Sequence, residues 1–163
     1  MATPTYTLID STTLTVATTT VTFSSIPQTY RDLVLVCGNV SSNSAGGSTL
    51  RFSLNNDNNA NYDAVWMYGD GTTTDSDSDS SNFYIRFSVT GGDIADNANA
   101  LLIINLMDYS QTDKHTTALV SRNDQNKVLR LAGRWKNTAA VTQIDVKAGI
   151  AAGATFHLYG IEA

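Results

Sequence analysis

The period of two in the apolar residues constrains the fold of this chain more than any other feature of its sequence. In residues 48–55 (STLRFSLN), Leu50, Phe52 and Leu54 fall on one side of an extended chain and the residues between them fall on the other. The same alternation recurs from end to end, whereas heptads and helical periodicity are not found. The pattern therefore predicts strands and no helices.

Segments with this alternation are separated by turns rich in Asn, Asp, Ser and Gly. The predicted strands are residues 5–10, 19–25, 32–40, 48–55, 63–69, 83–91, 100–109, 115–122, 127–135, 140–148 and 155–162. In the strand at 83–91 the expected apolar face is Phe83, Ile85, Phe87 and Val89. We expect one all-β domain over residues 1–163, a jelly-roll-like antiparallel β-sandwich of about ten strands.

One segment lies outside this pattern of strands. Residues 70–82 (DGTTTDSDSDSSN) are acidic and of low complexity, with no apolar residue to anchor them in a core. We interpret this segment as a loop that points into solvent.

The charge and the apolar runs exclude two kinds of partner. A formal net charge of −5 and an isoelectric point near 4.7 argue against binding nucleic acid through its phosphates. The longest apolar run, ALLIINLM, is far shorter than the roughly 20 residues that cross a bilayer, so we expect no membrane partner. Cys37 is the single cysteine, and its place in the apolar run LVLVC predicts a small buried hydrophobe.

Two predicted strands are apolar on both faces, namely LVLVC and LLIINLM. An isolated sandwich has one face of each sheet in the core and the other in water, so a second apolar face needs a cover. A neighbouring copy of the chain is the most economical cover, and we therefore predict a homo-oligomer. The expected interface with a copy or another protein is formed by Leu33, Leu35, Leu102, Ile104, His157 and Tyr159.

The segment NNDNNANYD places oxygen-bearing side chains at every second position, as the first part of a calcium loop does. These residues are Asp57, Asn59, Asn61 and Asp63. The similarity to an EF-hand then ends, because Tyr62 stands where the glycine is required. The sequence favours local turn hydrogen bonding over calcium, which stays the weaker alternative.

No set of residues indicates catalysis. No serine lies in a GxSxG context, no pair of carboxylates stands out, and His115 and His157 are interpreted as structural. We expect neither enzymatic activity nor a cofactor. Trp66 and Tyr68 could contact a glycan, but the favoured interpretation of Trp66 and Trp135 is that they anchor the core.

Several longer motifs resemble a known group of proteins. In chain order they are FSSIPQTYRDLVLVCGNVSS, RFSLNNDNNANYD, LMDYSQTDKHTTALVSRND, AGRWKNTAAVTQIDV and FHLYGIEA. This series is similar to small β-rich virion proteins and appendage domains of tailed bacteriophages, notably phages of cyanobacteria. The resemblance extends from about Leu8 to Ile161.

The resemblance implies a role in the virion. The expected function is that of a capsid decoration (cement) protein, a homotrimer that binds the phage major capsid protein and stabilises the shell. The alternative it leaves open is a receptor-binding module of a tail fibre or spike that recognises a host surface glycan. Location on the capsid surface or on the tail is not decided by the sequence.

Overall fold

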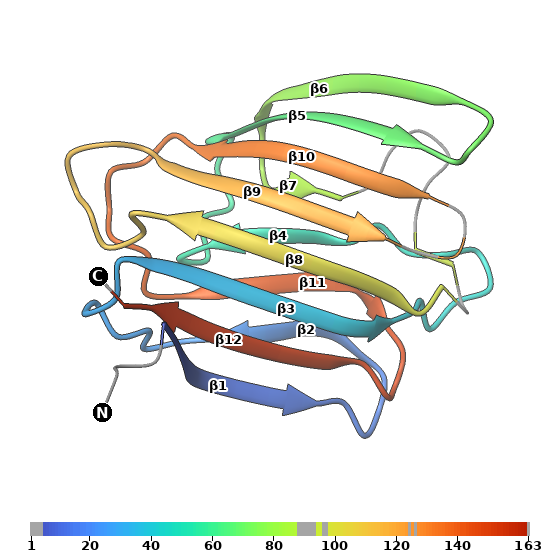
Figure 1. Cartoon of the computed structure of the whole chain (residues 1–163), viewed down its shortest axis with the longest axis horizontal. Helices are drawn as coiled ribbons and strands as arrows, with labels where there is room; N and C mark the ends of the chain where they lie inside the picture. The colour runs from blue at the N-terminus through green and yellow to red at the C-terminus, as the bar shows by residue number, and fades with distance from the viewer. Residues whose placement is uncertain (1–4, 88–93, 96–97, 124, 126, 163) are drawn as a thin grey trace.

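A computed structural model describes residues 5–87, 94–95, 98–123, 125 and 127–162. These residues form twelve strands in two sheets, with no helix among them, and every strand pairing is antiparallel. Figure 1 shows the two sheets lying one over the other. The predicted all-β, jelly-roll-like antiparallel sandwich is therefore confirmed, with twelve strands in place of about ten.

The larger sheet has eight strands. In spatial order they are β1 (Tyr6–Thr13), β12 (Thr155–Ile161), β3 (Asp32–Val40), β8 (Ala100–Met107), β9 (Thr116–Asn123), β10 (Val128–Trp135), β5 (Tyr62–Gly69) and β6 (Thr74–Asn82). The last strand, β12, pairs with both β1 and β3. The first and last strands of the described chain therefore lie side by side at one edge of the large sheet.

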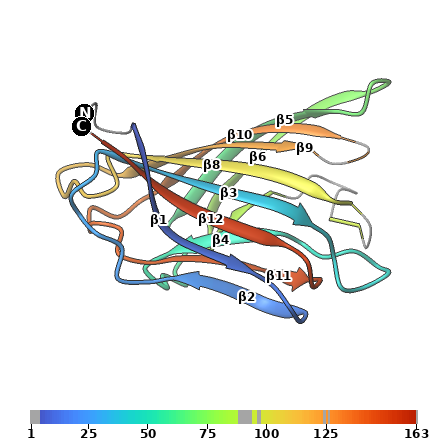
Figure 2. The same ribbon diagram turned by 60° about the horizontal axis from the view of Figure 1, so that its bottom comes forward.

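The smaller sheet has four strands. Their order is β2 (Thr18–Phe23), β11 (Ile144–Ile150), β4 (Arg51–Leu54) and β7 (Ile85–Arg86). Figure 2 shows β2, β11 and β4 beneath the large sheet. Each sheet thus has an inner face, which meets the other sheet, and an outer face.

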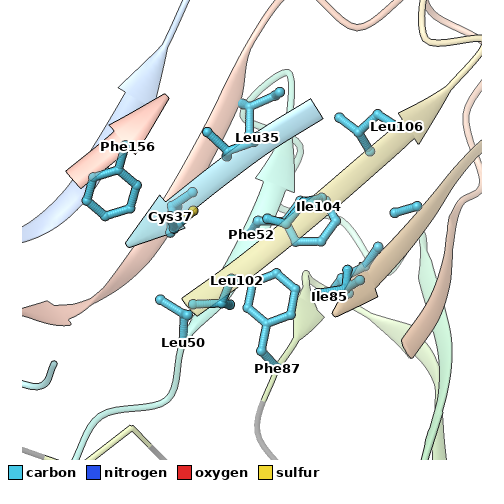
Figure 3. Close-up of a cluster of buried hydrophobic side chains, with 14 of the residues drawn as sticks. Leu35, Cys37, Leu50, Phe52, Ile85, Phe87, Leu102, Ile104, Leu106 and Phe156 are labelled. Atoms are coloured by element: carbon cyan, nitrogen blue, oxygen red, sulfur yellow. The ribbon is translucent and has the colours of Figure 1, made fainter. Parts of the chain in front are cut away.

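The core fills the space between the two inner faces. Alternate residues of β3 and β8 point down into it and meet side chains of β4 and β7 from below (Figure 3). Phe52 and Phe87 stack there, with ring centroids 5.2 Å apart. Leu50, Phe52 and Leu54 are all buried, as the alternation in residues 48–55 predicts.

Two sequence expectations need correction. The acidic segment expected to be a loop contains β6, because its backbone pairs with β5 along its length although Asp and Ser are poor strand formers. The strand expected at 83–91 is reduced to β7 in the described residues, and Phe83 is 55% exposed, so it does not share the buried face of Ile85. Val89 lies outside the described residues.

Candidate functional site

The outer face of the large sheet is the most unusual surface of the molecule. Strand pairing places one residue from each of the eight strands in a single row across this face. From β1 to β6 the row reads Leu8, Tyr159, Val34, Asn105, Leu119, Ala132, Val65 and Ser78. Six of these eight residues are hydrophobic, and among them Leu8, Leu119 and Val65 are each more than 40% exposed, whereas Val34 is buried and Asn105 and Ser78 are polar.

The neighbouring rows mix hydrophobic and polar side chains, because Arg130 and Ser121 stand between Met67 and Ile103. Met67, in the row beside Val65, is 64% exposed, and Val128, one row further, is 55% exposed. Ile103 and Val36 pair in the same row as Met67 and are half-buried. A lone exposed hydrophobic residue is ordinary, but several of them gathered on one face of a sheet are characteristic of a binding surface.

A hollow of about 760 Å³ lies on this face over β5, β9 and β10. Its apolar lining comes from the side of the strands that carries Val65, Met67 and Leu119. Asn105 and Arg130 add polar groups to the lining. We call this concavity the large-sheet hollow, and it is large enough for a protruding side chain or a small ligand.

The structure corrects the predicted interface at four positions. Leu33, Leu35, Leu102 and Ile104 are at most 1% exposed and point into the core. The strands are apolar on both faces, as expected, but the outward residues are the alternate ones. They are Val34 and Val36 on β3 and Leu101 and Ile103 on β8.

His157 and Tyr159 do lie on the outer face. Both are half-buried, and their ring centroids are 6.4 Å apart. Tyr6 meets Tyr159 edge to face at 6.4 Å. This aromatic group forms the β1 end of the apolar surface, opposite the large-sheet hollow.

In residues 55–63, which we call the Asn-rich turn, the carboxylate of Asp57 accepts hydrogen bonds from amide groups of the same segment. Oδ1 of Asp57 accepts hydrogen bonds from the backbone and side-chain N–H groups of Asn59 at 2.9 and 2.8 Å. Oδ2 accepts one from the side chain of Asn61 at 2.8 Å. These amides present hydrogens to Asp57, which is the arrangement of a turn and the reverse of a cation site, where oxygens converge.

The fourth member of the calcium pattern lies elsewhere. Asp63 forms ion pairs with Arg134 at 2.5 Å and with Lys136 at 3.0 Å. Hydrogen bonding to Arg134 is the main cause that lowers the pKa of Asp63 well below its ordinary value. Within the described part of the chain, no three His, Cys, Asp or Glu side chains are grouped so that they could hold a metal.

The two residues predicted to contact a glycan, Trp66 and Tyr68, lie in different environments. Trp66 is 6% exposed and belongs to the core, as the favoured interpretation expected, so it cannot offer its ring to a sugar as the alternative would require. Tyr68 is half-buried beside it, with Nζ of Lys127 5.2 Å from its ring centroid. Trp135 is likewise a core residue, 1% exposed.

The described residues contain no nucleophile that is hydrogen-bonded to a histidine base. No hydrogen bond connects His115 or His157 to a hydroxyl, a thiol or a carboxylate in residues 5–87, 94–95, 98–123, 125 and 127–162. Cys37 is fully buried, and burial raises the pKa of its thiol far above the ordinary value. In the same part of the chain, no helix is present that is long and apolar enough to cross a membrane.

Comparisons with known proteins do not identify a family for this chain. No protein-family model and no curated protein matches this chain. Among solved structures, the galectin LEC-6 of Caenorhabditis elegans matches with 10% identity and a TM-score of 0.36, over 100% of this chain and 99% of its own. The alginate lyase Aly36B matches with 12% identity and a TM-score of 0.38, over 93% of this chain and 77% of its own.

A fructosyltransferase from A. japonicus matches with 14% identity and a TM-score of 0.39. The match covers 96% of this chain but only 26% of the fructosyltransferase, so this chain corresponds to about a quarter of that enzyme. At these identities and TM-scores, none of the three similarities carries an argument about what this protein does.

Proposed function

We propose that this protein is a non-enzymatic structural subunit that associates with copies of itself through the outer face of its large sheet. The observation that carries the proposal is the row from Leu8 to Ser78, in which six of the eight residues, one from each strand of the large sheet, are hydrophobic. A surface of this kind is stable in water when a partner covers it.

The size of the face suits a stable interface. Eight strands spaced about 4.8 Å apart, each about eight residues long, span an area on the order of 900 Å². Stable protein interfaces of standard size bury about 800 Å² on each partner. In a cyclic trimer each copy would place part of this face against each of its two neighbours, so the exposed hydrophobic side chains of all three copies would be covered.

We further propose that the assembly is part of a phage virion. The resemblance of the sequence motifs to virion proteins supports this step, and it supports a trimer bound to the major capsid protein as a decoration protein. Many copies on a regular shell would give avidity to contacts that are individually weak. The described residues hold no arranged catalytic pair, which is compatible with a structural role.

The association can be tested by measuring the mass in solution. We expect light scattering to give a multiple of the 17.5 kDa chain mass for the native sequence. Leu119→Lys, at the centre of the row, should reduce that mass to a single chain because a charge cannot be buried there without a partner. Val16→Lys is the matched control, since Val16 is 72% exposed and lies outside both sheets.

A native sequence that remains a single chain at high concentration, or a Val16→Lys variant that dissociates as much as Leu119→Lys, would contradict self-association.

The location needs a separate measurement, which is the copy number in purified virions by quantitative mass spectrometry. Hundreds of copies per particle would support decoration of the shell. A few copies at one vertex would contradict it and favour the tail-appendage alternative.

A further inference from the structure

A second, smaller hollow lies on the outer face of the small sheet, on the opposite side of the sandwich from the proposed subunit contact. Its volume is about 310 Å³, which is near the lower end for ligand sites. We call it the small-sheet hollow. It is lined by Arg51, Ser53, Asn58, Phe83, Tyr84 and Lys147.

Two cations stand side by side in this hollow. Arg51 on β4 and Lys147 on β11 are direct partners in the strand pairing, and both side chains are on the outer face. Like charges directly opposite each other on neighbouring strands are destabilising. Across the described residues neither cation has a carboxylate partner, although the chain has a net charge of −5.

The nearby acidic groups are engaged elsewhere. Arg86, which pairs with Arg51 on its other side, is neutralised by two hydrogen bonds to Asp79 at 2.8 and 2.7 Å. Asp145, on the same face of β11 as Lys147, accepts hydrogen bonds from Thr22 at 2.7 Å and from Gln143 at 3.0 Å. The groups that donate to Asp145 are neutral, so its charge remains, but in the described residues it forms no ion pair with Lys147 or Arg51. An anion from outside the chain would relieve the repulsion between these two cations.

A buried hydroxyl in the lining has no partner. Ser53 is 1% exposed, and its Oγ makes no hydrogen bond. It is the strand partner of Asp145, yet the hydrogen bonds of that carboxylate go to Thr22 and Gln143. Buried polar groups without partners are uncommon and costly, and Ser53 lines the same hollow as the two cations.

An aromatic wall completes the hollow. Phe83 is 55% exposed, although the sequence pattern assigned it to the core. The guanidinium of Arg51 lies over the ring of Tyr84, with Cζ 4.7 Å from the ring centroid. A cation–π contact of this kind holds the guanidinium against the ring, and a guanidinium can hold a carboxylate with two hydrogen bonds.

We propose that the small-sheet hollow binds an acidic sugar residue of a polysaccharide. The carboxylate would lie on Arg51 and Lys147, a hydroxyl of the sugar would partner Ser53, and the ring would lie against Phe83. An exposed aromatic ring beside a compact cationic pocket suits a pyranose ring, which can pack its C–H face on the aromatic ring and carries one carboxylate, better than an extended acidic peptide, which needs a longer groove. Because this surface belongs to the small sheet, the site goes beyond the proposed assembly and does not depend on it.

The binding test uses trigalacturonate and its fully methyl-esterified form, which has the same rings without the charge. Isothermal titration calorimetry of the full chain should show binding of trigalacturonate, at least about tenfold weaker binding of the ester, and weaker binding as salt is raised. Chemical-shift changes on titration should centre on the residues of the small-sheet hollow. The proposal is overturned if trigalacturonate does not bind at millimolar concentration, or if the ester binds equally well.

Variants then test the residues. Arg51→Gln and Phe83→Ala should each weaken trigalacturonate binding by about tenfold, while Lys114→Gln, which removes a surface cation outside both hollows, should not change it. Both affected side chains are partly exposed, so the variants should fold, which the amide spectrum checks.

Inorganic phosphate and a Glu-rich peptide test whether the small-sheet hollow binds a simple anion or a protein partner in place of a sugar. If inorganic phosphate displaces the sugar and Phe83→Ala binds normally, the site takes an anion alone and the sugar proposal is wrong. If a Glu-rich peptide binds more tightly than trigalacturonate, the site is for a protein partner and the proposal is wrong as well. Weak binding of both probes relative to trigalacturonate supports it.

Discussion

Trp135 donates its indole N–H to Oδ2 of Asp57 over 2.7 Å, across 78 positions of the chain. The same indole stacks on Tyr62, with centroids 6.5 Å apart. Burial opposes the ionised form of Asp57, but hydrogen bonds from Asn61, Trp135 and Asn59 outweigh it and lower its pKa from 3.8 to about 2. A buried carboxylate thus ties the Asn-rich turn to β10 of the large sheet.

This carboxylate gives the stability a specific dependence on pH. The folded protein has the lower pKa, so the unfolded chain binds the proton more readily and stability falls as pH falls from about 4 towards 2. We expect Asp57→Asn to lower the free energy of unfolding by about 2 kcal/mol at pH 7, and by much less at pH 2, where the native carboxyl also becomes protonated. Denaturant titrations at several pH values measure this difference.

The exposed Asp113 provides the control for that measurement. Asp113→Asn should change the free energy of unfolding little at any pH. A difference between the native protein and Asp57→Asn that stays constant from pH 7 to pH 2 would show that the charge of Asp57 contributes nothing.

Gly160 is needed because the ring of Tyr30 lies against its backbone. A Cβ at position 160 would stand 2.3 Å from Cγ of Tyr30. Gly160→Ala should therefore lower the free energy of unfolding by about 2 kcal/mol, because the ring has to move. Gly69→Ala is the control, since its nearest neighbours would be at 3.5 Å, an ordinary contact.

A double variant separates this clash from other effects of alanine in a strand. When Tyr30→Ala is already present, the added Gly160→Ala substitution should cost little, because the ring is gone. Equal costs of Gly160→Ala in the native protein and in Tyr30→Ala would exclude the close approach as the cause. Thermal unfolding of the four proteins gives the comparison.

Cys37 should behave as a core residue. It is fully buried and pairs across the sheet with Phe156 on β12 and Leu102 on β8. We expect a thiol reagent to modify it only after unfolding, since burial raises the pKa of the thiol. Cys37→Ser should lower the free energy of unfolding by about 1–3 kcal/mol because its hydroxyl would be buried among apolar groups, and Cys37→Ala should cost less. Rapid modification of the folded protein would show that the strand opens.

The sequence predicts most of the strands but not the surface they build. Alternation identifies a strand such as β4, because Phe52 is apolar and its neighbours Arg51 and Ser53 are polar. On β3 and β8 both faces are apolar, so alternation cannot tell which of Leu35 and Val36 points inward. The row across the large sheet depends in addition on the order and register of eight strands, and these are set by pairing between distant segments.

The small-sheet hollow was missed for a related reason. Phe83 fits the apolar alternation of residues 83–91, but β7 begins only at Ile85, so Phe83 lies in the bend before the strand and its ring is on the surface. Arg51 and Lys147 are 96 positions apart, so no local pattern relates them. Turn chemistry, by contrast, is local, and Asp57 with Asn59 and Asn61 forms the expected hydrogen bonds.

The strand β6 gives the last prediction, because its composition and its structure point in opposite directions. Asp and Ser are poor strand formers, and both faces of β6 are largely exposed, so the sequence alone favours a loop. In the structure, backbone pairing with β5 holds it, from Tyr68 opposite Asp75 to Ala64 opposite Asp79. Asp79 adds an ion pair to Arg86 at 2.7 Å.

Hydrogen exchange of the amides of β6 distinguishes the two interpretations. As the edge strand of the sheet, β6 can direct only every second amide towards β5, so protection should alternate along residues 74–82. Arg86→Gln should weaken this protection at the Asp79 end, by about 1 kcal/mol or less because the pair is partly exposed. Uniformly fast exchange over residues 74–82 would show that the segment is a loop, as its composition suggests.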